Sequence, residues 1–287
     1  MMPQASKLSD MMPPESLPLG LGCSRLGSVN GASGEEARTL LKAALEEGYR
    51  FFDTSSIYGQ GDSERMLGEV LAGQDDALVC SKAGKYLSWK KRALVPLKTL
   101  LRGMARKSER ARRGVSAARA NPMPTRWDSV FLTTSLEGSL RRLRRDRIDL
   151  FMLHSPPAEV VARGEAIDAL EAARKAGKIG LIGVSVDDVA CAEAALRDPR
   201  VQALQVPLLP GATEFEPVLD QATEAGIAVI AREILGGAQA ISGASDPAAY
   251  AADRISTLVH DTRVTLPLVG TTRLKNLQSS ARAARTE

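Results

Sequence analysis

The chain has 287 residues, of which 44% are hydrophobic and 25% charged, and its formal net charge is +4. This composition is typical of a globular protein, and no uncharged apolar run approaches the ~20 residues that a membrane span needs. The length suits one α/β barrel domain as well as two smaller domains.

The first part of the chain, residues 1–17, lacks the apolar segment of a secretory signal. We interpret it as a flexible or lightly docked leader and expect a cytoplasmic protein. The three cysteines, Cys23, Cys80 and Cys191, are odd in number and have no CxxC spacing. This pattern argues against a disulfide framework or a zinc site, so we expect buried thiols and no metal.

Short apolar runs alternate along the chain with longer segments of helical period. Eight of these runs have the length and composition of buried strands. Several of the helical segments end at a glycine that fits a C-terminal cap, namely Gly48, Gly73, Gly177 and Gly226. The predicted strands cover residues 19–23, 49–54, 77–81, 148–153, 179–185, 201–206, 227–231 and 265–270.

Eight strands in βα alternation predict a parallel sheet covered by helices, and eight is the number that closes a barrel. We therefore predict an α/β fold, a (β/α)8 TIM barrel, as a single domain over residues 18–287. The weakest segment, 232–264, indicates one broken helix, which keeps a doubly wound open sheet as an alternative. That alternative lacks support because Gly20, Gly22 and Gly27 do not have the GxGxxG spacing of a dinucleotide-binding turn.

A basic insert interrupts the alternation after the third strand. Residues 85–126 carry thirteen Lys or Arg and one acidic residue, Glu109, a net charge of +12 against +4 for the whole chain. We expect either a lid or docking surface for an anionic substrate or an acidic carrier protein, or a solvated insertion. Its scarcity of aromatic residues argues against nucleic acid, because single strands are bound by base stacking.

Four polar residues lie at or just after the ends of consecutive predicted strands. Asp53 ends the second strand, Lys82 follows the third and His154 follows the fourth, while Tyr58 lies in the loop after the second. In barrel enzymes, catalytic groups gather at the C-terminal ends of the strands. Each residue alone could be structural, but neighbouring strands should bring all four together.

These four side chains could polarise a carbonyl group. The ammonium of Lys82 would stabilise the phenolate of Tyr58 and lower its pKa from about 10. Asp53 would hold Lys82 in place, and His154 could donate a hydrogen bond to the same oxygen as Tyr58. A polarised carbonyl accepts a hydride, which no side chain supplies, so we expect a nicotinamide cofactor.

Six segments of the chain resemble, in order and spacing, the signature segments of aldo-keto reductases: "GYRFFDTSSIYGQGDSERMLGEVL", "LVCSKAG", "DRIDLFMLHSPP", "GKIGLIGVS", "LQVPLLP" and "LPLVGTTRLKNL". The resemblance extends from about residue 18 to the C-terminus. It implies a (β/α)8 barrel that binds NADPH or NADH without a Rossmann domain and reduces aldehydes or ketones, or runs in reverse. It also implies a catalytic tetrad of Asp53, Tyr58, Lys82 and His154.

The same resemblance implies residues that bind the nicotinamide end of the cofactor. Ser185 and Gln205 match positions that bind the carboxamide. Val186 stands where the family usually has an asparagine, so one hydrogen bond of the family pattern is absent. Arg232 follows the seventh strand, where the family often has a tyrosine that stacks on the nicotinamide, and its guanidinium could replace that ring.

The family's adenosine-phosphate segment corresponds to the start of the last helix, where backbone N–H groups and the helix dipole favour phosphate. Asn276 stands where the family commonly has an arginine. Arg273 or Lys275 could replace that arginine, so we expect NADPH, with NADH as the alternative. The phosphate-binding segment itself consists of Gly270, Thr271 and Thr272.

Three functional interpretations follow. The first is an NAD(P)H-dependent oxidoreductase whose substrate is a small carbonyl or alcohol, an anionic or carrier-tethered compound being one option. The second is a cofactor-binding regulatory protein with little turnover, which would suit the departures from the family pattern at Val186, Asn276 and Ser280. The third uses the same tetrad for elimination or isomerisation. The sequence sets neither the substrate nor the direction of reaction.

Overall fold

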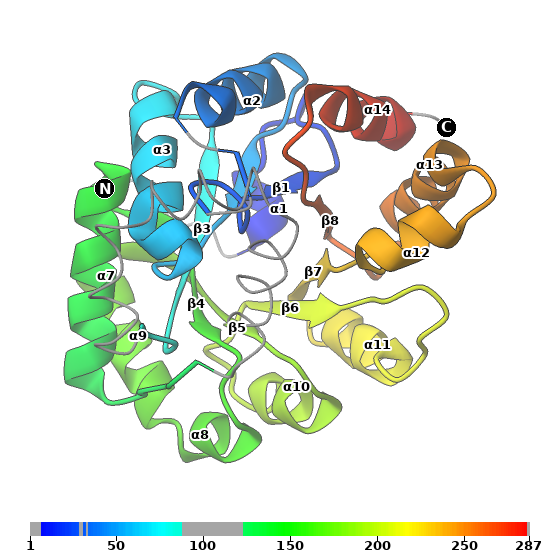
Figure 1. Ribbon diagram of the computed structural model, residues 1–287. Helices are drawn as coiled ribbons and strands as arrows, with labels where there is room; N and C mark the ends of the chain where they lie inside the picture. The colour runs from blue at the N-terminus through cyan, green and yellow to red at the C-terminus, as the bar shows by residue number, and fades with distance from the viewer. Residues whose placement is uncertain (1–6, 29–30, 33, 88–122, 286–287) are drawn as a thin grey trace.

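Eight parallel strands form a closed barrel that helices surround (Figure 1). The computed structural model describes residues 7–28, 31–32, 34–87 and 123–285. Each strand pairs with the next one in sequence, and β8 pairs with β1, which closes the ring. The strands are β1 (Gly20–Gly22), β2 (Phe51–Asp53), β3 (Leu78–Ala83), β4 (Ile148–His154), β5 (Ile179–Ser185), β6 (Ala203–Pro207), β7 (Ala228–Arg232) and β8 (Leu266–Val269).

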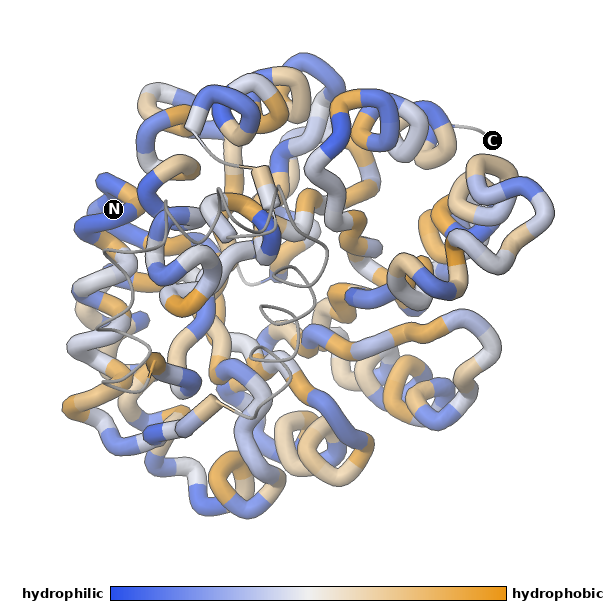
Figure 2. Tube along the Cα trace, in the orientation of Figure 1, coloured by the Kyte–Doolittle hydropathy of each residue, from blue (hydrophilic) through white to orange (hydrophobic). Residues whose placement is uncertain are grey.

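An outer ring of helices covers the barrel. Along these helices hydrophobic and hydrophilic residues alternate in Figure 2, as amphipathic helices on a barrel require. The helices are α1 (Leu8–Met11), α2 (Glu35–Glu46), α3 (Asp62–Val70), α7 (Ser129–Leu143), α8 (Ala158–Arg163), α9 (Glu165–Lys175), α10 (Val189–Leu196), α11 (Glu216–Glu224), α12 (Gly237–Gly243), α13 (Pro247–Val259), α14 (Leu274–Arg285) and the 3-10 helix η1 (Tyr58–Gly61).

The predicted barrel is confirmed, and each predicted strand ends within two residues of the observed one. The doubly wound alternative is wrong. Where one broken helix was expected over 232–264, there are two helices, α12 and α13, and the Asp246 carboxylate caps α13 by accepting from the Ala248 and Ala249 amides. The three cysteines are confirmed as buried free thiols.

Alternate side chains of each strand point into the barrel, and on β2 to β7 these inward rows begin apolar and then reach polar residues. The apolar side chains that fill the inside of the barrel form one cluster, which we call the interior cluster. On β3, Leu78 and Cys80 belong to it, and Lys82 is the next residue on the same face of the strand. On β4, Met152 is followed in the same way by His154. Polar groups therefore collect at the C-terminal end of the barrel. The same rule places Asp53, Ser185 and Arg232 at the ends of β2, β5 and β7, and Gln205 two residues before the end of β6.

The opposite end of the barrel is closed by α1, which Figure 1 shows in projection inside the ring of strands. Leu8 is fully buried in the interior cluster, together with Phe51 and Leu78, the first residues of β2 and β3. The described part of the predicted leader, residues 7–17, therefore contacts the barrel through Leu8. A helix of four residues has no periodicity that could have predicted this plug, and the domain boundary at residue 18 stays a prediction.

Shortening Leu8 is expected to destabilise the fold. The Leu8→Ala variant should lower the free energy of unfolding by about 2–5 kcal/mol, because it removes methyl groups from a packed interior and leaves a cavity. Urea denaturation measures this loss. Leu274→Ala is the matched control, since Leu274 is 42% exposed and its truncation should cost less than about 1 kcal/mol. Equal losses in the two variants would show that α1 does not plug the barrel.

The basic insert is described only at its two ends, since residues 88–122 lie outside the described part of the chain. Lys85 and Thr125 form an antiparallel bridge, and two backbone hydrogen bonds of 2.9 and 2.8 Å flank it. This two-stranded stem continues from the end of β3, next to the polar end of the barrel. Among the described residues, no helix is long and apolar enough to cross a membrane.

Candidate active site

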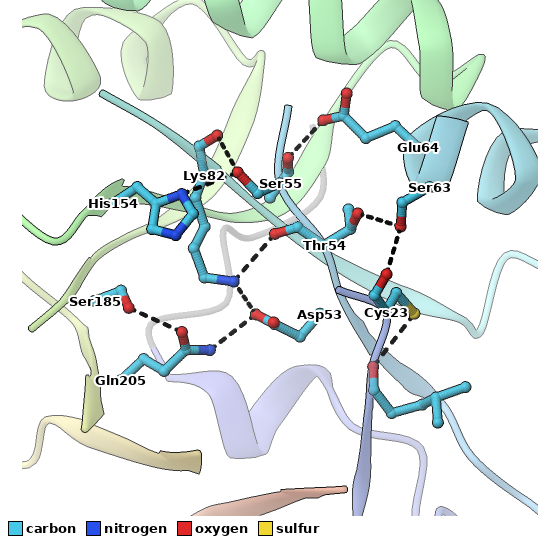
Figure 3. A network of polar contacts seen from close by, with 12 residues as sticks. Cys23, Asp53, Thr54, Ser55, Ser63, Glu64, Lys82, His154, Ser185 and Gln205 are labelled. Atoms are coloured by element: carbon cyan, nitrogen blue, oxygen red, sulfur yellow. Dashed lines mark hydrogen bonds and ion pairs between the residues drawn. The ribbon is translucent and has the colours of Figure 1, made fainter. Parts of the chain in front are cut away.

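A buried ion pair between Asp53 and Lys82 lies at the polar end of the barrel (Figure 3). Lys82 is fully buried, and its ammonium also donates to the backbone oxygen of Thr54 at 3.0 Å. Burial by itself lowers the pKa of Lys82, but the Asp53 carboxylate more than offsets this, and the net pKa is raised. Lys82 therefore stays charged beside the other groups of the site.

Tyr58 begins η1 and lies above this ion pair. The Lys82 ammonium is 5.4 Å from the centroid of the phenol ring, and the His154 ring meets Tyr58 edge to face, with centroids 5.7 Å apart at 89°. Burial raises the pKa of Tyr58, and the neighbouring Lys82 only partly offsets that effect. The expectation that Lys82 gives Tyr58 a pKa below about 10 is thus wrong, and the phenol is protonated at neutral pH.

A left-handed turn places Tyr58 over the barrel. Gly59, Gln60 and Gly61 have φ values of 57°, 64° and 88°. A Cβ on Gly59 would lie 2.7 Å from the backbone oxygen of Leu26, so a glycine is required for this close approach. The chain then enters α3 directly.

Gly61 is the N-cap residue of α3, so neither Asp62 nor Ser63 caps this helix, although both are residue types that favour that position. Ser63 faces the barrel, where its hydroxyl donates to the Cys23 oxygen at 3.0 Å and lies 2.8 Å from the Thr54 hydroxyl. The hydroxyl thus ties the start of α3 to the loop after β1 and to the end of β2.

His154 is buried and neutral. Burial, followed by the charges of Lys82, Lys85 and Arg232, lowers the pKa of His154 well below 6.5. Its Nδ1 lies 3.0 Å from the Ser55 hydroxyl, whose single proton can be donated either to Nδ1 or to the Lys82 backbone oxygen at 3.3 Å. When Ser55 donates its single proton to Nδ1, Nε2 carries the ring proton. Figure 3 shows that second nitrogen on the side of the ring away from Ser55.

This neutral histidine makes stability depend on pH. In the unfolded chain His154 takes up a proton near pH 6.5, whereas in the folded protein it stays neutral to lower pH. Stability is therefore fully present above that pH and falls as the pH drops below it, by about 1.4 kcal/mol per pH unit. We predict that His154→Gln removes this component, measured by urea unfolding between about pH 7 and pH 5.

The other histidine provides the control for that measurement. His260 is exposed at the C-terminal end of α13, so the His260→Gln variant should keep the wild-type pH dependence. Parallel stability curves for wild type and His154→Gln would contradict a neutral, buried His154.

A chain of hydrogen bonds links the ion pair to the ends of β5 and β6. The Ser185 hydroxyl donates to Gln205 Oε1 at 2.9 Å, and Gln205 Nε2 donates to Asp53 Oδ1 at 2.8 Å. All three side chains are buried. The two residues predicted to bind the carboxamide are thus fixed relative to the predicted catalytic residues.

Arg232 is held by the loop after β5. Its guanidinium donates to the Val186 oxygen at 2.7 Å and to the Asp187 carboxylate at 2.5 Å, and it forms an ion pair with Glu233. Asp187 and Glu233 are both exposed, whereas Arg232 is mostly buried. The guanidinium is therefore fixed at the mouth of the barrel by two carboxylates that line the same cavity.

One cavity of about 1120 Å³ opens over these groups. Of the twelve predicted site residues, eleven line it, and Lys82 lies beneath its floor. The cavity runs from Tyr58 and His154 to the segment before α14, where the Thr271 hydroxyl accepts from the Arg273 amide at 3.1 Å. Its volume slightly exceeds the range for small-molecule and cofactor sites, roughly 300–1,000 Å³.

Comparison with models of known protein families shows to which family the chain belongs. Residues 18–257 match the model of the aldo/keto reductase family. The chain belongs to this family. The predicted resemblance is thereby confirmed.

Curated relatives of this aldo/keto reductase family member are similar at modest identity. A 6-dehydroglucose reductase of Novosphingobium aromaticivorans is 27% identical over 245 residues, which cover 78% of this chain and 67% of the relative. A D-threo-aldose 1-dehydrogenase of a Pseudomonas species is 32% identical over 177 residues, which cover 58% of this chain and 49% of the relative. The chain thus spans about half of the second relative's length and two thirds of the first.

Solved structures have the same fold. An aldo-keto reductase of Bacillus halodurans, in its holo form, superimposes with a TM-score of 0.73 at 19% identity, over 94% of this chain and 87% of that one. An aldo-keto reductase of Klebsiella pneumoniae in complex with NADP and acetate gives a TM-score of 0.65 at 18% identity, over 94% and 86%. At such identities the likeness establishes the fold.

Several residues at this family member's site were not predicted from its sequence. Ser55 contacts His154, Ser155 contacts Lys85, and Asp187 holds Arg232. Each lies one or two residues beyond a strand end that the apolar pattern had located. Proximity to a strand end was therefore the available signal, but it did not show which side chains meet.

Proposed function

We propose that this chain is an NAD(P)H-dependent oxidoreductase that transfers hydride between nicotinamide and the carbonyl carbon of an aldehyde or ketone. One observation carries the proposal. A single cavity is lined by a protonated phenol and a neutral imidazole above a buried ion pair, and it continues to the start of α14. Such a cavity offers proton donors at one end and a phosphate-binding helix start at the other.

The residues along the cavity fit a nicotinamide cofactor. With its proton given to Gln205, the Ser185 hydroxyl keeps acceptor capacity, and the Gln205 amide keeps a second N–H donor, which together match a carboxamide. At the far end, Gly270 is exposed and Arg273 is an exposed cation at the start of α14. A cation at this position favours NADPH over NADH, because NADPH carries an additional phosphate. When bound, the nicotinamide supplies the hydride that side chains cannot supply.

The chain's own residues handle the proton. In reduction, the proton leaves the Tyr58 hydroxyl for the carbonyl oxygen, which becomes the hydroxyl of the alcohol, and the Lys82 ammonium stabilises the resulting phenolate. His154, uncharged, donates a hydrogen bond from Nε2 to the same oxygen and orients the carbonyl. Asp53 keeps Lys82 in place. In oxidation of an alcohol the same proton returns to Tyr58.

The names of the curated relatives suggest the substrate class. One is a 6-dehydroglucose reductase and another a D-threo-aldose 1-dehydrogenase, so sugars and related small carbonyl compounds are proposed as substrates. The polar lining of the cavity supports this choice, since hydroxyl-rich substrates need hydrogen-bonding partners.

The proposed function is tested by the absorbance of the reduced nicotinamide. The full chain is mixed with NADPH or NADH and a panel of aldehydes, ketones and aldoses, and the decay is recorded. Decay that requires both protein and a carbonyl compound is the expected result, faster with NADPH. Cofactor binding without decay for any carbonyl would instead favour a regulatory protein on the same barrel. Conversion of a compound without any cofactor would favour isomerisation or elimination.

A further inference from the structure

We infer that Lys85 forms a carboxylate-binding subsite beside the carbonyl site, so that the preferred substrates are carbonyl compounds that carry a carboxylate. The inference rests on the proposed function for the carbonyl half of the substrate only. The subsite itself rests on the position, contacts and surroundings of the Lys85 ammonium.

Lys85 is placed rigidly at the mouth of the barrel. It pairs with Thr125 in the stem of the basic insert, directly beyond β3. Next to it, Gly84 leaves no room for a Cβ, because the Trp127 ring packs against its Cα. The side chain of Lys85 lines the same cavity as Tyr58 and His154. A fixed backbone thus presents a cation to the cavity near the predicted proton donors.

The contacts of the ammonium leave it able to bind a ligand. Within the described residues, Nζ donates to the Ser155 hydroxyl at 2.8 Å, a neutral partner, and lies 3.9 Å from the Asp187 carboxylate. The second distance is too long for a hydrogen bond, and Asp187 is already engaged by Arg232 at 2.5 Å. An ammonium has three donors, so a ligand oxygen can be accommodated.

The turn that carries Ser155 is itself unusual. Ser155 directly follows His154 and has a φ of 55°, a left-handed conformation that non-glycine residues rarely adopt. Its amide donates to the Ser185 backbone oxygen at 2.8 Å, which holds the turn in place. Such strained residues concentrate at functional sites, and this one aims a hydroxyl at Lys85.

The distribution of charge favours an anion on the cavity side. The side chains of Lys85 and Arg232 are only 21% and 20% exposed, whereas those of Asp187 and Glu233 are 58% and 55% exposed. All four side chains line the same cavity, but water screens the two more exposed carboxylates more than the two cations. Burial and nearby cations also lower the pKa of Lys85, an effect that a bound carboxylate would reverse.

The part of the cavity at Lys85 is separate from the part, before α14, that suits phosphate. Lys85 and Ser155 follow β3 and β4, whereas the start of α14 follows β8, which neighbours β7 and β1. At Lys85 the described donors are one ammonium and one hydroxyl. Two donors match the two oxygens of a carboxylate, whereas phosphate sites usually add helix N-termini or arginine forks.

A matched pair of aldehydes tests the subsite. We compare 4-carboxybenzaldehyde with its methyl ester, methyl 4-formylbenzoate, which lacks the charge and is larger by one methyl group, in wild type and Lys85→Gln. For the acid, Lys85→Gln is expected to raise KM about ten- to a hundredfold with a smaller change in kcat, because a charge-assisted hydrogen bond is lost. For the ester, kcat/KM should change less than about threefold, and Lys85→Arg should restore part of the preference for the acid. Lys175→Gln, which removes an exposed charge on α9, should behave like wild type.

A measurement without turnover separates this inference from the proposed function. The full chain is titrated calorimetrically with 4-(hydroxymethyl)benzoate and its methyl ester. If neither aldehyde is reduced but the acid still binds more tightly in wild type and not in Lys85→Gln, the proposed function fails and the subsite stands. Equal affinity of acid and ester in wild type, or an unchanged preference in Lys85→Gln, overturns the subsite whatever the turnover.

Discussion

Replacement of Tyr58 by phenylalanine is expected to lower kcat for carbonyl reduction by about 10²- to 10⁴-fold, the usual contribution of a positioned proton donor. The substitution removes only the hydroxyl, so the edge-to-face contact with His154 is retained. The loss should therefore appear in kcat with little change in the free energy of unfolding. Steady-state kinetics and urea denaturation on the same preparation measure both quantities.

Another tyrosine provides the control for this loss. Tyr49 is fully buried, and its hydroxyl donates to the backbone oxygen of Leu277 in α14 at 3.3 Å. Tyr49→Phe should reduce stability by about 1 kcal/mol and leave turnover close to wild type. Turnover of Tyr58→Phe within tenfold of wild type would mean that another group donates the proton.

The second large effect concerns the buried ion pair. Lys82→Met leaves the Asp53 carboxylate buried without its cation, and Asp53→Asn leaves the ammonium without its anion. Each single variant is expected to lose about 3–5 kcal/mol of unfolding free energy, as buried pairs do when one partner is removed. The double variant, which buries no charge at this position, should lose clearly less than the sum of the two single variants.

Thermal and urea unfolding of wild type, the two single variants and the double variant complete this double-mutant cycle. Turnover of the same four proteins is a second measurement. The two variants that lack Lys82 should be inactive or nearly so, because Tyr58 loses its neighbouring ammonium. Asp53→Asn should also lose turnover, because burial lowers the pKa of Lys82 once the Asp53 carboxylate no longer offsets it. Additive stability losses would show that Asp53 and Lys82 are not energetically coupled. Near wild-type turnover of the double variant would show that Lys82 takes no part in the proposed proton transfer.

Much of the fold could be predicted because barrel strands have a strong local signal. A run such as 179–185 is apolar on both faces, since one face meets the barrel interior and the other meets helices. Its polar end at Ser185 follows from the same periodicity. The positions of Asp53, Lys82 and His154 could therefore be predicted from strand ends alone.

The rest depended on contacts that no local pattern records. Leu8 lies in a stretch with no periodicity and finds its partners at the far end of the barrel. The pKa of Tyr58 depends on a balance between burial and one charge, and burial outweighs the charge. Ser63 fits the pattern of a helix cap but bonds to the loop after β1. Such outcomes are decided by tertiary packing, which competes with the local preference.

The central claim is that this cavity transfers hydride from nicotinamide to a carbonyl carbon. Its most direct test uses NADPH deuterated at C4 of the nicotinamide, with the full chain and the best aldehyde of the panel, and mass spectrometry of the product alcohol. The account predicts one deuterium on the carbinol carbon with wild type and greatly slowed formation of that product with Tyr58→Phe. An alcohol without deuterium for either C4 epimer of the cofactor, or no alcohol at all, would contradict it.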